Sequence, residues 1–118
     1  MKTYAGIDPQ VLEAVTGGNA EIADRIIQRY LSSADAEIGQ LSALSAQGDR
    51  AALRRQAHRV LGAAATVGAT GVEKAARELE QAILDGSDER RLSSLIEQVT
   101  AAFAAVSKVP TGDRGLAG

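Results

Sequence analysis

Residues 50–84 read RAALRRQAHRVLGAAATVGATGVEKAARELEQAIL and carry a clear helical pattern. Apolar and small side chains recur every three or four residues, a spacing that places them on one face of an α-helix. The GATG segment at residues 68–71 interrupts this pattern, because glycine favours turns over helix interiors. We therefore predict one helix over residues 50–66 and another over residues 71–85, with Thr70 as the N-cap of the second. The expected core face of the first helix consists of Leu53, Ala57, Val60, Ala64 and Val67.

Three more helices are expected outside this stretch. A short helix begins at residue 9 and ends by the Gly17-Gly18 pair, a long helix follows to about residue 46, and a final helix runs to about residue 108. Residues that favour N-caps precede each of them, and one precedes the helix at residue 50. The expected N-caps are Asp8, Asn19, Asp49 and either Ser87 or Asp88.

The connections between these helices are short, and no segment shows the sustained alternation of a strand. Sequential helices with short connections pack as antiparallel neighbours. We predict an all-α fold, an antiparallel up-down four-helix bundle with a short extra N-terminal helix. The bundle is expected to occupy residues 1–108 as one domain, and residues 109–118, which are small and polar, a disordered tail or linker.

The composition excludes several kinds of site. The 118 residues include one histidine and no cysteine, so a structural zinc site, a disulfide framework and a thiol nucleophile are not expected. A formal net charge of −2 and an aromatic content of 3% argue against nucleic-acid binding. No apolar run suits a membrane span and the N-terminus carries no signal-peptide pattern, so we expect a cytoplasmic protein that binds neither membranes nor metal ions.

The single histidine, His58, is expected to point away from the core of its helix. A helical wheel places Arg54 and Arg55 one turn before it and Gly62 one turn after it, with Leu61 and Ala65 on the same face. An exposed neutral imidazole has a free lone pair and can form a covalent adduct. The guanidinium groups could stabilise a phosphoryl group on the ring, and Gly62 would leave room for another protein. An incidental surface histidine on a plain helical scaffold remains an alternative.

The segment AHRVLGAAATVGATGVEKAARELE, residues 57–80, resembles the histidine-containing phosphotransfer (HPt) domain of bacterial multistep phosphorelays. The resemblance extends, more weakly, over residues 8–106. It implies a signalling intermediate without kinase or phosphatase activity of its own. His58 would accept a phosphoryl group from a receiver-domain aspartate and pass it to the aspartate of another receiver. It also implies response-regulator receivers and a hybrid sensor kinase as partners, a monomeric chain, no bound cofactor, and Mg²⁺ on the partner receiver.

Two positions depart from the family's pattern. Leu61 stands where the family often has a lysine, and Ala63 replaces a common serine. We expect Arg54 and Arg55 to restore the positive charge near the phosphate, and Leu61, Gly62 and Ala65 to form a receiver-docking patch. Loss of the lysine leaves a second hypothesis open, a docking module that binds a receiver or kinase without carrying phosphate.

Overall fold

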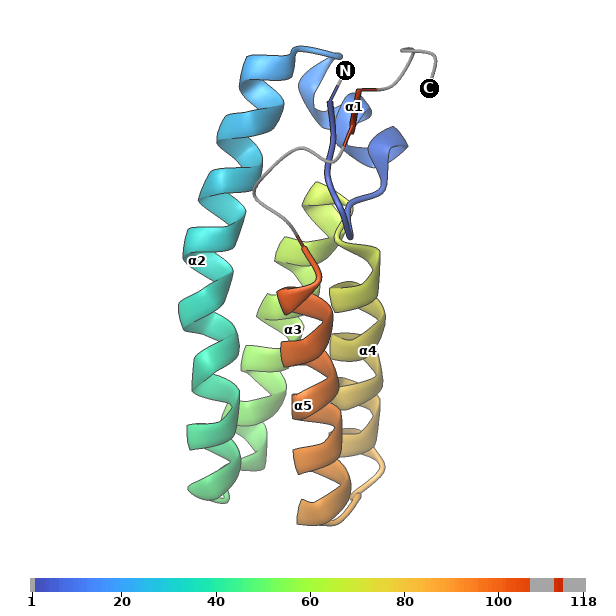
Figure 1. Ribbon diagram of the computed structural model, residues 1–118. Helices are drawn as coiled ribbons and strands as arrows, with labels where there is room; N and C mark the ends of the chain where they lie inside the picture. The colour runs from blue at the N-terminus through green and yellow to red at the C-terminus, as the bar shows by residue number, and fades with distance from the viewer. Residues whose placement is uncertain (1, 107–111, 114–118) are drawn as a thin grey trace.

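Five helices build the computed structural model, which describes residues 2–106 and 112–113. A short helix, α1 (Pro9–Thr16), precedes four longer ones: α2 (Ala20–Ala46), α3 (Arg50–Val67), α4 (Thr70–Leu84) and α5 (Glu89–Ala104). The four long helices run alternately down and up, and α1 lies across one end of the bundle (Figure 1). The predicted antiparallel four-helix bundle with an extra N-terminal helix is confirmed.

Side-chain caps begin four of the helices where the sequence predicts them. The carboxylates of Asp8, Asp49 and Asp88 and the amide oxygen of Asn19 each accept a hydrogen bond from a backbone N–H of the first helical turn. The predicted cap at Thr70 is wrong. Thr70 is the first residue of α4, and the capping position is held by the fully buried Ala69, whose N–H donates to the carbonyl of Ala64.

The end of α5 also differs from the prediction. The helix ends at Ala104, not near residue 108, and residue 108 itself lies outside the described residues. The chain turns there because Val106 is buried against the N-terminal segment, with its backbone next to Gly6. Tertiary packing therefore overrides the continuing helical pattern.

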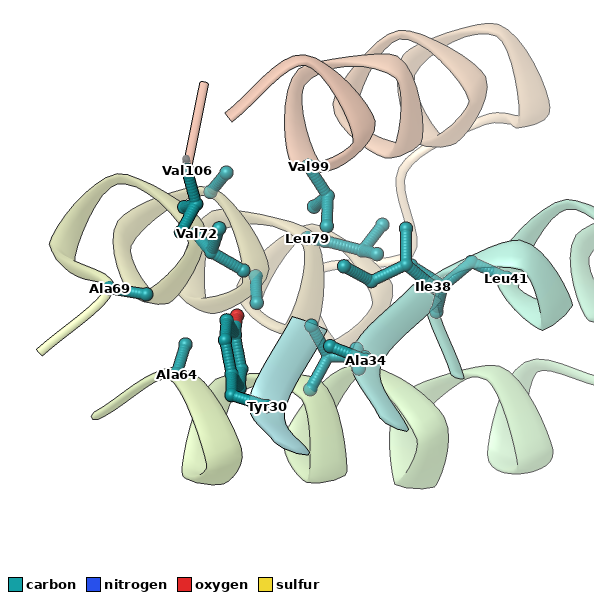
Figure 2. Close-up of a cluster of buried hydrophobic side chains, with 14 of the residues drawn as sticks. Tyr30, Ala34, Ile38, Leu41, Ala64, Ala69, Val72, Leu79, Val99 and Val106 are labelled. Atoms are coloured by element: carbon teal, nitrogen blue, oxygen red, sulfur yellow. The ribbon is translucent and has the colours of Figure 1, made fainter. Parts of the chain in front are cut away.

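A single apolar core fills the space between the four long helices. The expected core face of α3 is buried as predicted, and side chains from α2, α4 and α5 meet it (Figure 2). Near one end of this core, the rings of Tyr30 and Phe103 pack edge to face with centroids 5.9 Å apart. Buried Gln56 joins α3 to α2, since its Nε2 donates to the carbonyl of Glu37 at 2.8 Å.

The α3–α4 turn holds α1 against the bundle. Gly68 has a positive φ of 82°, and its carbonyl accepts a hydrogen bond of 2.7 Å from the N–H of Asp8. A Cβ atom at position 68 would lie 2.9 Å from the Cβ of Val11, so the close approach requires glycine. This turn fixes where α3 ends and α4 begins, and so fixes how their exposed faces align.

Two very short strands pair antiparallel at the same end of the molecule, β1 (Lys2–Thr3) with β2 (Gly112–Asp113). Apart from Gly112–Asp113, the expected tail at residues 109–118 lies outside the described residues, and its disorder stays a prediction.

Candidate functional site

His58 lies in the middle of α3 on the face opposite the core. Its side chain is 71% exposed, whereas the neighbouring Ala57 and Val60 are buried. The predicted outward orientation of His58 is therefore confirmed. An imidazole placed in this way is accessible to a second protein.

The ring of His58 has one partner on the adjacent helix. Its Nδ1 lies 3.1 Å from Oε2 of Glu80 on α4, and the Glu80 side chain is only 17% exposed. A carboxylate accepts hydrogen bonds and does not donate them, so this contact is a hydrogen bond in the tautomer whose proton is on Nδ1. The neutral ring then has its lone pair on Nε2, which has no partner among the described residues.

Sequence reasoning did not assign a role to Glu80. The residue is the last one of the segment 57–80 that carries the family resemblance, but no pattern in the sequence assigned it a function. A signal was present, because Glu80 directly follows the fully buried Leu79 and so lies at the edge of the buried face of α4. That signal does not reveal which residue of α3 Glu80 meets.

A shallow depression surrounds this pair, lined by Arg54, Arg55, His58, Glu80 and Leu84; we call it the His58 hollow. Arg54 Nε lies 3.9 Å from Glu80 Oε2, and the arginine side chain is 52% exposed. Helical side chains lean toward the helix N-terminus, so the ring of His58 leans over the turn that carries the two arginines. The structure therefore brings both predicted phosphate neighbours to the histidine.

The three residues predicted to dock a receiver differ in exposure. Gly62 is exposed, and a Cβ atom built there would meet nothing within 4 Å. Leu61 packs partly against the core, and Ala65 is also half-buried. Glycine inside a helix costs about 1 kcal/mol relative to alanine. Since no packing within the described chain requires this glycine, its open surface is free for a partner.

Other kinds of site find no counterpart in the part of the chain that the structure describes. Within it, no three His, Cys, Asp or Glu side chains converge in a way that could hold a metal ion. None of its helices has both the length and the apolar character that a membrane crossing requires.

Comparison with protein families matches residues 25–108 to the family described as the Hpt domain. This chain belongs to the Hpt domain family. The matched segment begins in α2 and contains the whole His58 hollow. The sequence-based resemblance is thereby confirmed, and this Hpt domain is a phosphotransfer intermediate of phosphorelay signalling rather than a kinase or phosphatase.

Solved structures agree with this family. The chain is 26% identical to histidine-containing phosphotransfer protein B (HptB) of Pseudomonas aeruginosa PAO1, with a TM-score of 0.75 over 84% of this chain and 85% of that one. The Hpt domain of a sensor hybrid histidine kinase from Shewanella has the same fold, with 15% identity, a TM-score of 0.64, and coverage of 85% and 89%. A search of curated proteins finds no match.

Proposed function

We propose that His58 is the phosphoryl acceptor of this Hpt domain and that the reaction takes place at Nε2. The observation that carries the proposal is the 3.1 Å contact between Nδ1 and Glu80, which leaves the Nε2 lone pair on a ring that is 71% exposed. His58 is also the only histidine of the chain. A histidine-based transfer domain with a single histidine has no other candidate.

The donor is an aspartyl phosphate on a receiver domain. The Nε2 lone pair forms the N–P bond while the P–O bond to the aspartyl carboxylate breaks, and the electron pair of that bond leaves with the carboxylate. The ring becomes positively charged, with its Nδ1 proton shared with Glu80. Transfer to a second receiver reverses the step, since an aspartyl carboxylate attacks phosphorus and the N–P bond breaks.

The residues around His58 have roles in the transfer that follow from their positions. Glu80 holds the ring in the reactive tautomer and favours the positive charge that develops on it. Arg54 and Arg55 lie beside the incoming phosphoryl group and offset its negative charge. Leu61, Gly62 and Ala65 border His58 on its other side and contact the receiver.

The proposal leaves the rest of the catalytic machinery to the partner. The receiver supplies Mg²⁺, and this chain contributes a nucleophile and a docking surface without a cofactor or an enzymatic activity of its own. We further propose that the chain acts as a monomer in the cytoplasm, with receivers and a hybrid sensor kinase as partners and without nucleic-acid or membrane binding.

The test is transfer from a phosphorylated receiver. The protein is incubated with a ³²P-labelled receiver and Mg²⁺, and the label that reaches it is expected to be acid-labile and base-stable, as for phosphohistidine. His58→Gln should abolish the label without unfolding the exposed site. Label that persists in His58→Gln would disprove the proposal, and receiver binding without any label would favour the docking-only alternative.

A further inference from the structure

A large apolar side chain lies exposed inside the His58 hollow. Among the described residues only Val15, Ile22 and Leu84 are large, hydrophobic and exposed, and Leu84 is the most exposed of them at 55%. Leu84 lines the hollow, whereas Val15 in α1 and Ile22 near the start of α2 lie at the opposite end of the bundle (Figure 1).

The antiparallel pairing of α3 and α4 explains why Leu84 lies beside the arginines. Leu84 follows Glu80 by four residues, and Arg54 precedes His58 by four, so each pair lies on one helix face. Because the two helices run in opposite directions, both steps lead toward the same end of the bundle. The His58–Glu80 pair is therefore continued by a second level that consists of Arg54, Arg55 and Leu84, which we call the shelf.

The shelf combines an uncovered apolar group with positive charge. Arg54 has only the long 3.9 Å contact to Glu80, and Arg55 is exposed with no ion pair among the described residues. Interfaces gain affinity from buried apolar anchors and specificity from complementary charges at their rim. The group that fits such a surface is an apolar side chain flanked by carboxylates.

We propose that the shelf of Arg54, Arg55 and Leu84 selects the receiver, by binding an apolar side chain with neighbouring carboxylates on the receiver's docking surface. This inference rests on the proposed phosphorylation of His58, because a receiver must cover that residue to exchange the phosphoryl group. A standard interface buries about 800 Å² on each partner, equivalent to a disc of roughly 16 Å radius. The shelf lies about 4.5 to 6 Å along the helix from His58, three or four residues at 1.5 Å each, well inside that footprint.

The experiment compares Leu84→Asp and Leu84→Ala with Val15→Asp and Ile22→Asp, which change exposed hydrophobic residues far from the hollow. Isolated receiver domains are phosphorylated with acetyl phosphate and Mg²⁺, and the receiver that transfers fastest is titrated against each variant. Leu84→Asp should lower transfer at limiting receiver roughly tenfold, with the rate at saturating receiver within about twofold of wild type. Leu84→Ala should show a smaller loss of the same kind, and the two controls none.

A second donor separates docking from chemistry. Phosphoramidate, a small phosphodonor, labels histidine without a receiver, and Leu84→Ala, which adds no charge to the hollow, should be labelled at the wild-type rate. Equal receiver-dependent transfer by Leu84→Asp and its controls would overturn the proposed role of the shelf, and so would a loss of phosphoramidate labelling in Leu84→Ala. If neither donor labels wild-type His58, the proposed function fails. The shelf is then judged by whether Leu84→Asp weakens receiver binding in a fluorescence titration.

The charged half of the shelf has its own control. Arg55→Glu should slow transfer at limiting receiver and flatten its dependence on salt, because rim charges act mainly on association. Arg29→Glu, a charge reversal at an exposed position of α2, should leave both unchanged. An identical salt dependence in wild type and Arg55→Glu would show that Arg55 does not contribute to receiver binding by the shelf.

Discussion

Nδ1 of His58 lies 3.1 Å from Oε2 of Glu80, although the two residues are 22 positions apart in the chain. The contact joins the exposed face of α3 to the edge of the buried face of α4. It engages one ring nitrogen and leaves the other available, which is the arrangement that the proposed role of His58 as a nucleophile requires.

Replacing Glu80 should change the tautomer of His58. In wild type, the neutral ring is expected to carry its proton on Nδ1, and Glu80→Ala should shift the proton toward Nε2. The change can be followed by ¹⁵N NMR, with no ambiguity of assignment because the chain has one histidine. Transfer should fall about tenfold, because a hydrogen bond to a charged group contributes about 1.5 kcal/mol or more. Transfer should fall less in Glu80→Gln, which keeps an acceptor oxygen. A wild-type ring protonated mainly at Nε2 would contradict this role.

Removing the two arginines should weaken phosphoryl transfer. The double variant Arg54→Ala/Arg55→Ala is expected to transfer roughly threefold to tenfold more slowly, since exposed charge contacts contribute about 1 kcal/mol or less. The phosphohistidine lifetime should change as well. Arg29→Ala on α2 is the matched control. Unchanged rates and lifetime in the double variant would show that these arginines do not compensate for the leucine at position 61.

Gly62 and Gly39 offer a matched pair for separating stability from function. Each lies within a helix, and at neither position would a Cβ atom meet anything within 4 Å. Both Gly62→Ala and Gly39→Ala should raise the free energy of unfolding by about 1 kcal/mol in urea titrations. Only Gly62→Ala should slow transfer from a receiver, because its new methyl group lies beside His58. Slower transfer in Gly39→Ala, or unchanged transfer in Gly62→Ala, would contradict the docking role of Gly62.

Stability should fall at alkaline pH through Tyr30. Burial, and to a smaller degree the charge of Glu37, raises the pKa of Tyr30 to about 12 from an ordinary value of 10.0. Between these two values the unfolded tyrosine loses its proton while the folded one keeps it. The unfolded state then binds fewer protons, so stability decreases as the pH rises from 10 to 12.

The comparison for this effect is Tyr30→Phe. The hydroxyl of Tyr30 is buried without a hydrogen-bond partner in the described part of the chain, so its removal should cost little at neutral pH. Urea unfolding at pH 9 and pH 11 should show a smaller loss for Tyr30→Phe than for wild type. Tyr4 keeps its own raised pKa, caused by burial and then Asp24, in both proteins and cancels from the comparison. Equal losses of stability in wild type and Tyr30→Phe would show that Tyr30 does not cause the decrease at alkaline pH.

Local features of the sequence were enough for most of the fold. The caps at Asp8, Asn19, Asp49 and Asp88 depend on residues within one helical turn, so they could be predicted from neighbours in the chain. The outward position of His58 also follows from the spacing of apolar residues on its own helix. Where a boundary depends on packing, the prediction was wrong: Ala69, and not Thr70, holds the N-cap position of α4, and α5 ends at Ala104 so that Val106 can be buried.

The sequence by itself determined the helices, their antiparallel order, the outward histidine and its two arginines, because each depends on spacings of a few residues. Only the tertiary structure decided that Glu80 meets Nδ1 of His58 and that Leu84 lies beside Arg54 and Arg55. Those contacts depend on how far α4 is shifted along α3. The shift is set by the tight Gly68 turn and by the fit of the buried side chains, and neither can be deduced from the periodicity of one helix.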